Sequence, residues 1–167
     1  LIGLVGSEMC IRDRMRNFAF KFGDETIESR ASSPANKFEP GKRPMSTMHP
    51  IMIFDKKGKL YLITGSPGGS QIPAANLRLV TGIIDFGLHV GDATMLPRIH
   101  KDWPYAGIEY ETTLSQDNIN LLQRIGHRLD LSDTIGSTQS IQIIDGINYG
   151  FADLRRPNAG VSIEKSN

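Results

Sequence analysis

Residues 51–70 read Ile51-Met-Ile-Phe-Asp-Lys-Lys-Gly-Lys-Leu-Tyr-Leu-Ile-Thr-Gly-Ser-Pro-Gly-Gly-Ser70, and this stretch decides the fold. Two β-prone runs, 51–54 and 59–64, flank a turn that contains Gly58, which is typical of a β-hairpin. The second run leads directly into a glycine-rich turn. Apolar residues then recur at helical spacing from Leu77 to Leu88. We therefore expect a hairpin, a glycine turn and a helix, in that order.

Further elements follow on both sides of a strand expected over Ile108 to Thr113. Before this strand, Asp92 is placed to cap a short helix that stops ahead of Pro97. After it, Ser115 is a good N-cap for a helix that Gly126 closes.

A second hairpin is expected near the C-terminus. Two β-prone runs, 139–144 and 147–152, flank the two-residue turn Asp145-Gly146. Hairpins and helices thus occur in blocks, without the βαβ alternation of a parallel sheet. This order favours an α+β fold with antiparallel sheets.

The composition excludes several function classes. The 167 residues include 19 basic and 18 acidic side chains, a net charge of +1, which offers no electrostatic footprint for nucleic acid. No apolar run approaches the roughly 20 residues that span a bilayer. Cys10 is the single cysteine, so no intrachain disulfide can form. The four histidines lie far apart in sequence, and we expect neither a metal site nor a cofactor.

The first fourteen residues, LIGLVGSEMCIRDR, resemble the translation of a sequencing adapter. They show no convincing amphipathic period, and we expect residues 1–14 to be a non-native segment. The alternative is a genuine N-terminal strand. The domain proper is then expected over residues 15–167.

The patch Thr64-Gly-Ser-Pro-Gly-Gly-Ser70 is the first candidate site. Consecutive glycines allow close backbone approach and can turn two N–H groups toward one point. Gly68 and Gly69 near a helix start could stabilise a developing oxyanion. A plain tight turn is the alternative reading, whereas a phosphate cradle lacks its usual lysine.

A second patch, Gly41-Lys-Arg-Pro-Met-Ser-Thr-Met-His-Pro50, carries paired hydroxyls between two prolines. Ser46 and Thr47 could bind a carboxylate, but a capped loop that enters a strand explains them equally well. A nucleophile–base pair of Ser46 and His49 is a weak possibility, because such partners meet in space rather than in sequence.

A third patch comprises Gly136-Ser-Thr-Gln-Ser-Ile141, Gly150-Phe-Ala-Asp153 and the pair Arg155-Arg156. Polar side chains around strand ends suit either hydrogen bonding within the core or support of a site. The patch is not specific by itself.

Taken in order, these patches resemble the small, C-terminal subunit of the γ-glutamyltransferase (γ-glutamyl transpeptidase) family. The resemblance rests on Lys42-Arg-Pro-Met-Ser-Thr-Met48, Thr64–Ser70, Ala93–Arg98 and Gly136-Ser-Thr-Gln-Ser140, and covers about Met15 to Arg156. It implies a partial small subunit of an N-terminal-nucleophile hydrolase, a four-layer αββα sandwich with antiparallel sheets. It also implies a large subunit of the same precursor as partner, no cofactor, and a periplasmic or secreted location.

Members of this family cut their own precursor, and the new N-terminal threonine attacks the γ-glutamyl amide of substrates such as glutathione. The glutamyl group then passes to water, an amino acid or a peptide. By this resemblance Gly68 and Gly69 supply the oxyanion hole, and Ser46 and Thr47 hold the glutamyl α-carboxylate. The nucleophilic threonine belongs upstream of Met15, so the chain alone is expected to be inactive.

Two departures from the family pattern leave alternatives open. Met15-Arg-Asn-Phe18 stands where the family usually reads Met-Asp-Asp-Phe, which puts Asn17 where an aspartate pairs with the substrate ammonium. An amidase or acylase that acts on substrates without an α-amine is therefore a second hypothesis, and a non-catalytic assembly subunit is a third. The run Asp153-Leu-Arg-Arg-Pro157 also departs from the family's Asp-Pro-Arg.

Overall fold

The computed structural model describes residues 18, 34–43, 48–102 and 107–163, which fall into two units, 1–47 and 48–167. In the first unit a short 3-10 helix, η3, covers Pro34–Asn36. The Phe18 ring meets the Phe38 ring edge-on, with centroids 5.2 Å apart. The segment expected to be non-native, residues 1–14, lies outside the described residues, so that expectation stays a prediction.

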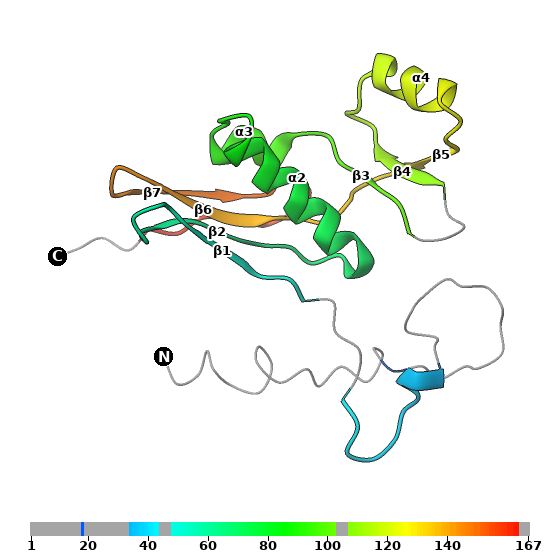
Figure 1. Cartoon of the computed structure of the whole chain (residues 1–167), viewed down its shortest axis with the longest axis horizontal. Coiled ribbons are helices and arrows are strands. Elements are labelled where there is room, and N and C mark those ends of the chain that lie inside the picture. Colours follow the sequence, from blue (N-terminus) through cyan, green and yellow to red (C-terminus); the bar gives the residue numbers. More distant parts are fainter. Residues whose placement is uncertain (1–17, 19–33, 44–47, 103–106, 164–167) are drawn as a thin grey trace. The chain divides into compact units, whose positions relative to one another are not determined.

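The second unit is built on a four-stranded antiparallel sheet of order β1-β2-β6-β7 (Figure 1). Both expected hairpins are present: β1 (Ile51–Phe54) pairs with β2 (Leu60–Gly65), and β6 (Gln139–Ile144) pairs with β7 (Ile147–Ala152). β2 and β6 join the hairpins, and Thr64 lies opposite Ser140. The Thr64 and Ser140 hydroxyl oxygens are 2.8 Å apart and buried.

Two helices cover one face of this sheet (Figure 1). They are α2 (Ile72–Ile84) and α3 (Val90–Met95). The core between sheet and helices consists of apolar side chains that are almost completely buried, namely Leu62, Leu79, Ile83, Val90 and Ala93. Burial of each leucine, isoleucine or valine in this set contributes about 1.5–3 kcal/mol, so this layer holds the helices on the sheet.

The inward face of β6 is polar rather than apolar. Ser140 and Gln142 are buried, and the Gln142 amide links α3 to β2: its oxygen accepts from the Val90 N–H at 2.9 Å, and its nitrogen donates to the Tyr61 hydroxyl at 2.9 Å. The opposite face carries apolar residues in register, with Met52 65% exposed and Ile141 41% exposed. The face of the sheet away from the helices is therefore apolar.

A smaller sheet of order β3-β4-β5 follows α3. β3 (Ile99–His100) pairs antiparallel with β4 (Ile108–Glu111), and β4 pairs parallel with β5 (Leu129–Ser132). α4 (Gln116–Arg124) is the crossover between the two parallel strands. The Ser115 side chain accepts from the Asn118 N–H, as the expected N-cap does.

The structure corrects two expected helix boundaries. α2 begins at Ile72 rather than near Leu77, with a proline in its first turn, and ends at Ile84. α3 is capped by His89, whose ring nitrogen accepts from the Gly91 N–H at 3.4 Å, whereas Asp92 lies in the first turn. The expected strand over 108–113 stops at Glu111. β3 and β5 had no sequence prediction, and the parallel pair β4–β5 with its crossover helix α4 departs from the expectation of antiparallel sheets without βαβ units.

Candidate functional site

The glycine turn connects β2 to α2 through a 3-10 turn, η4 (Gly69–Gln71). Gly68 and Gly69 both have positive φ, at 135° and 59°, which favours glycine at each position. No described residue accepts a hydrogen bond from the N–H of Gly68 or Gly69. A Cβ at Gly69 would meet open space. Two unpaired amides at a helix start, one beside open space, can stabilise a negatively charged oxygen.

The turn packs backbone to backbone against residues 135–138, the segment between β5 and β6. A Cβ at Gly68 would lie 3.2 Å from the Gly136 Cα. A Cβ at Gly136, whose φ is 65°, would lie 2.8 Å from the Ala75 Cβ and would also crowd the Ser66 hydroxyl. Neither position accepts a side chain without displacing its neighbour, so the two glycines set the distance between turn and segment.

Four consecutive amides of the 135–138 segment donate hydrogen bonds, the outer two to buried carboxylates and the inner two to residues of the glycine turn. The Ile135 N–H donates to Glu111 at 2.9 Å and the Thr138 N–H to Asp153 at 2.9 Å. Between them, the Gly136 N–H donates to the Gln71 side-chain oxygen at 3.3 Å, and the Ser137 N–H to the Ser66 hydroxyl at 2.8 Å. The segment thus ties the glycine turn to a pair of buried carboxylates.

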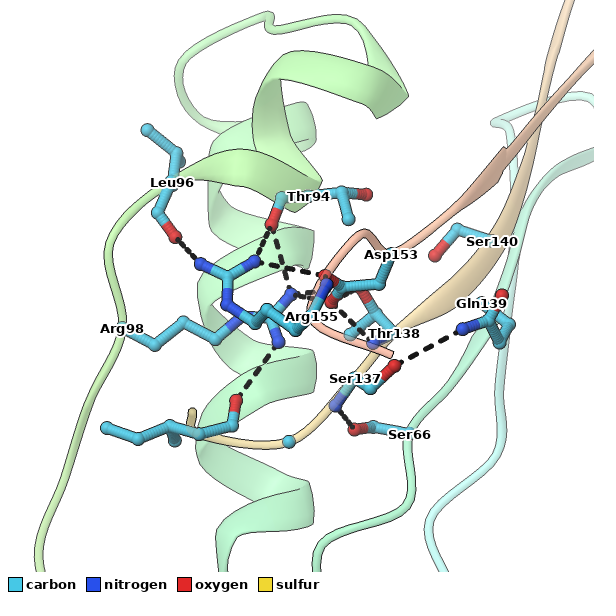
Figure 2. A network of polar contacts seen from close by, with 12 residues as sticks. Ser66, Thr94, Leu96, Arg98, Ser137, Thr138, Gln139, Ser140, Asp153 and Arg155 are labelled. Carbon is cyan, nitrogen blue, oxygen red and sulfur yellow. Dashed lines mark hydrogen bonds and ion pairs between the residues drawn. The ribbon is translucent and has the colours of Figure 1, made fainter. Parts of the chain in front are cut away.

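One of these carboxylates, Asp153, is fully buried and lies against the buried Arg98 side chain (Figure 2). The Arg98 guanidinium donates to Asp153 Oδ2 at 2.7 Å, to the Thr138 hydroxyl at 3.0 Å and to the Ile135 carbonyl at 3.0 Å. The Nε of Arg98 is buried and has no hydrogen-bond partner among the described residues. The other Asp153 oxygen accepts from the Arg155 amide at 3.0 Å.

Glu111 at the end of β4 forms a bidentate pair with Arg155. Both oxygens of Glu111 accept from the Arg155 guanidinium at 2.6 Å, through Nε and Nη2. Glu111 also accepts from the Arg98 backbone N–H at 3.0 Å. Arg98 and Arg155 both donate to the Thr94 carbonyl, at 3.0 and 2.8 Å, which satisfies the C-terminal end of α3.

The pKa directions of Asp153 and Arg155 agree with this pairing, and that of Arg98 does not. Burial by itself raises the pKa of Asp153, but the Arg155 amide, the Arg98 guanidinium and the Thr138 amide outweigh it and hold the pKa below its usual range. Burial opposes the charge of Arg155, yet its pairing with Glu111 and Asp153 raises its pKa. Burial lowers the pKa of Arg98 despite the neighbouring Asp153. The hydrogen bonds and ion pairs therefore favour the ionised forms of Asp153 and Arg155, whereas at Arg98 the effect of burial prevails.

Only part of the sequence-predicted site falls among the described residues. Gly68 and Gly69 lie on the turn described above, whereas Asn17, Ser46 and Thr47 lie outside the described residues. His49, two residues beyond Thr47, is held by Asn76 of α2, whose amide nitrogen donates to the His49 carbonyl at 2.7 Å.

The third patch of the sequence analysis has a structural role that the sequence left undecided. Its Ser137 amide donates to the glycine turn, and its Thr138 amide and Asp153 belong to the buried ion network around Arg98. Glu111 and Gln71 are the partners that sequence reasoning missed, because nothing in their local sequence distinguishes them from ordinary polar residues. Among the described residues there is no group of three or more histidine, cysteine or acidic side chains that could hold a metal. No described helix is long and apolar enough to cross a membrane.

Comparisons with known proteins identify the family of this chain. The family model Gamma-glutamyltranspeptidase matches residues 6–163. The glutathione hydrolase proenzyme of Escherichia coli (strain K12) is 38% identical over 156 residues, which is 92% of this chain and 27% of that protein. The glutathione hydrolase proenzyme of Arthroderma benhamiae is 41% identical over 129 residues, which is 77% of this chain and 22% of that protein.

Solved structures give the same answer. The γ-glutamyltranspeptidase of Pseudomonas nitroreducens in complex with L-DON has a TM-score of 0.77 and 28% identity, and the match covers 91% of this chain and 80% of that one. A cephalosporin acylase from Bacillus halodurans has a TM-score of 0.69 and 25% identity, over 79% of this chain and 25% of that one. The chain belongs to the γ-glutamyltranspeptidase family. Its α+β fold is that of the solved members of this family, which are N-terminal-nucleophile hydrolases. It spans about a quarter of the length of the curated relatives that it matches.

Proposed function

We propose that this chain is the small-subunit part of an enzyme that cleaves γ-glutamyl amides such as glutathione and passes the glutamyl group to water, an amino acid or a peptide. The observation that carries the proposal is the glycine turn, where the Gly68 and Gly69 amides have no acceptor among the described residues and Gly69 faces open space. Acyl transfer needs two such donors at the oxygen that becomes negative in the transition state. The relatives named glutathione hydrolase support the choice of substrate class.

The roles of the other site residues follow from the family pattern. Ser46 and Thr47 are proposed to bind the glutamyl α-carboxylate through their hydroxyls, and Asn17 to face the α-amino group. A threonine supplied by the precursor upstream of Met15 is proposed as the nucleophile, with its own amine as base. A periplasmic or secreted location is proposed on family resemblance alone.

The apolar outer face of the sheet supports a partner from the same precursor. Met52, Ile63 and Ile141 stand in one row across β1, β2 and β6, and Met52 and Ile141 are largely exposed. A row of apolar side chains on a sheet is stable only when another layer covers it. We propose that the large subunit supplies that layer, and that the relatives' name proenzyme reflects the same two-part construction.

Asn17 favours a second candidate function, an acylase acting on substrates that lack the α-amine. An aspartate at this place would accept a charge-assisted hydrogen bond from an ammonium, whereas asparagine offers a neutral oxygen and an NH₂ donor. The similarity to a cephalosporin acylase fits this alternative.

Expression of the complete precursor, with its upstream coding sequence, tests the proposal. The purified protein is expected to release p-nitroaniline from a γ-glutamyl anilide. Turnover of glutaryl p-nitroanilide alone would favour the acylase, and self-cleavage without turnover of either substrate would contradict both enzymatic functions. The non-catalytic assembly subunit would then be the remaining hypothesis.

A further inference from the structure

We propose that Gln71 and Glu109 are positioning residues that clamp the glycine turn and orient the Gly68 and Gly69 amides. This inference rests on the proposed function, because the amides matter only if they face a reacting oxygen. It concerns two side chains outside the oxyanion pair and outside the buried ion network. Neither of them needs to touch the substrate.

A turn built on two glycines with positive φ needs outside support. Glycine has the largest backbone freedom of any residue, whereas donors to a transition state must be held to within about 0.5 Å. Upstream of the pair, Ser66 supplies one anchor by accepting the Ser137 N–H at 2.8 Å. Downstream of the pair, the anchor is Gln71, the last residue of η4.

Gln71 contacts two separate elements through the two ends of its amide. The oxygen accepts the Gly136 N–H at 3.3 Å, and the nitrogen donates to Glu109 Oε2 on β4 at 2.8 Å. The second bond is charge-assisted, and both residues are half-buried. Gln71 therefore joins the turn, the 135–138 segment and the small sheet at a single point.

Ser70, the residue before Gln71, is also hydrogen-bonded to a carboxylate near the small sheet. The Ser70 hydroxyl donates to Asp102 Oδ2 at 3.1 Å, and the other oxygen of Asp102 lies 3.1 Å from the buried His100 ring nitrogen. Ser70 and Gln71 immediately follow Gly69, and each is tied to a carboxylate in or just after β3 or β4. The small sheet thus anchors the downstream side of the glycine turn twice.

The chemistry of the Gln71–Glu109 pair allows a reversal test. Gln71→Glu keeps an oxygen for the Gly136 N–H but sets two carboxylates against each other. Adding Glu109→Gln restores a donor–acceptor pair with its polarity reversed. A residue with only a general structural role has no reason to be rescued by this exchange. Gln123→Glu on the exposed face of α4 is the control for added charge.

The experiment uses the complete precursor, and γ-glutamyl anilide turnover is measured well below the melting temperature of each variant. Gln71→Glu is expected to lower kcat about 10- to 100-fold with KM changed less than threefold, because misplaced donors fail chiefly in the transition state. The double variant is expected to recover kcat to within about threefold of the parent, and the control to match the parent. Unchanged kcat in Gln71→Glu, or no recovery in the double variant, overturns the proposal.

Hydrogen exchange of the Gly136 amide gives a second readout that does not depend on turnover. Exchange is expected to be about tenfold faster in Gln71→Glu, because repulsion from Glu109 moves the new carboxylate away from the Gly136 N–H, and about 1.4 kcal/mol of lost hydrogen bonding equals a factor of ten. The double variant removes the repulsion and is expected to return to the parent rate. An inactive parent with this exchange pattern contradicts the proposed function and leaves the clamp standing. An active parent without it contradicts the clamp.

Discussion

Arg98 and Asp153 form an ion pair of 2.7 Å in which the side chains are only 1% and 0% exposed. The pair joins the end of α3 to the end of β7, and the Thr138 amide and hydroxyl contact it as well. Burial of two charges is costly, and only dense hydrogen bonding compensates for it. This pair and its neighbours therefore define the part of the second unit that is most sensitive to substitution.

The first prediction concerns the loss of Asp153. Asp153→Ala leaves the buried Arg98 charge uncompensated and is expected to reduce the free energy of unfolding by about 3–5 kcal/mol. The control is Asp130→Ala, which breaks an exposed pair with Arg128 whose side chains are 45% and 75% exposed. That change is expected to cost about 1 kcal/mol or less. Equal losses in the two variants, measured by denaturant unfolding, would contradict the prediction.

The second prediction concerns acid. The folded-state pKa of Asp153 lies below its unfolded value. Its ionisation therefore contributes stability above the unfolded pKa, about 3.9, and that contribution is lost as the pH falls through the folded pKa. Asp153→Asn lacks this contribution at every pH. The melting-temperature gap between parent and Asp153→Asn is expected to be widest at pH 5–7 and to narrow below about pH 4. A gap independent of pH would count against the assignment.

The third prediction separates two adjacent arginines. Arg155 meets both oxygens of Glu111 with a planar fork that lysine cannot reproduce, whereas Arg156 is exposed. Arg155→Lys is expected to lower the free energy of unfolding by about 1.5–3 kcal/mol, the contribution of one hydrogen bond to a charged group. Arg156→Lys is expected to change it by less than about 0.5 kcal/mol. Thermal unfolding of both variants provides the comparison.

The fourth prediction addresses the oxyanion donors. Gly69→Val forces a β-branched side chain into left-handed backbone and is expected to move the amide out of line. Loss of one donor of this kind lowers kcat about 10²–10³-fold. Gly58→Val is the matched control, because Gly58 in the β1–β2 turn also has positive φ, at 77°, and open space at its Cβ. The control is expected to keep kcat. Similar kcat values in two folded variants would show that Gly69 does not stabilise the oxyanion.

The fifth prediction concerns substrate choice. Asn17→Asp is expected to raise kcat/KM for a γ-glutamyl anilide about 10- to 150-fold, because a charge-assisted hydrogen bond to the ammonium contributes about 1.5–3 kcal/mol. Glutaryl anilide, which has no α-amine, is expected to gain nothing. If the ratio of kcat/KM for the two substrates stays constant, Asn17 does not read the ammonium.

Local patterns account for much of the fold that the sequence could predict. Asp145 and Gly146 have φ of 50° and 81°, and only a few residue types adopt such values in a two-residue hairpin turn. The Asp-Gly pair therefore predicts β6 and β7 with their full lengths. Ser115 likewise marks the start of α4 by its side-chain chemistry. The apolar spacing places the start of this helix near Leu77, whereas α2 begins at Ile72 with Pro73 in its first turn, where proline is well tolerated.

The remaining elements depend on contacts distant in sequence. β3 has two residues and β5 has four, and each is a strand only because β4 lies beside it. Glu111 shows the same limit at the site. Its side chain accepts four hydrogen bonds from residues 98, 135 and 155, and no local pattern brings those positions together. The glycine pair was recognisable because positive φ and close approach are properties of glycine itself.

The contact between Thr64 and Ser140 sets the order in which the molecule can assemble. The two hydroxyls meet across the centre of the sheet, yet they are 76 positions apart in the chain. At about 5–20 residues per second, a ribosome needs roughly 4–15 s to make the intervening segment. Throughout that interval β2 presents an unpaired edge, and α2 and α3 have only half of the sheet beneath them. A nascent chain that stalls ahead of β6 therefore exposes an unpaired strand edge, which is a site where chains can aggregate.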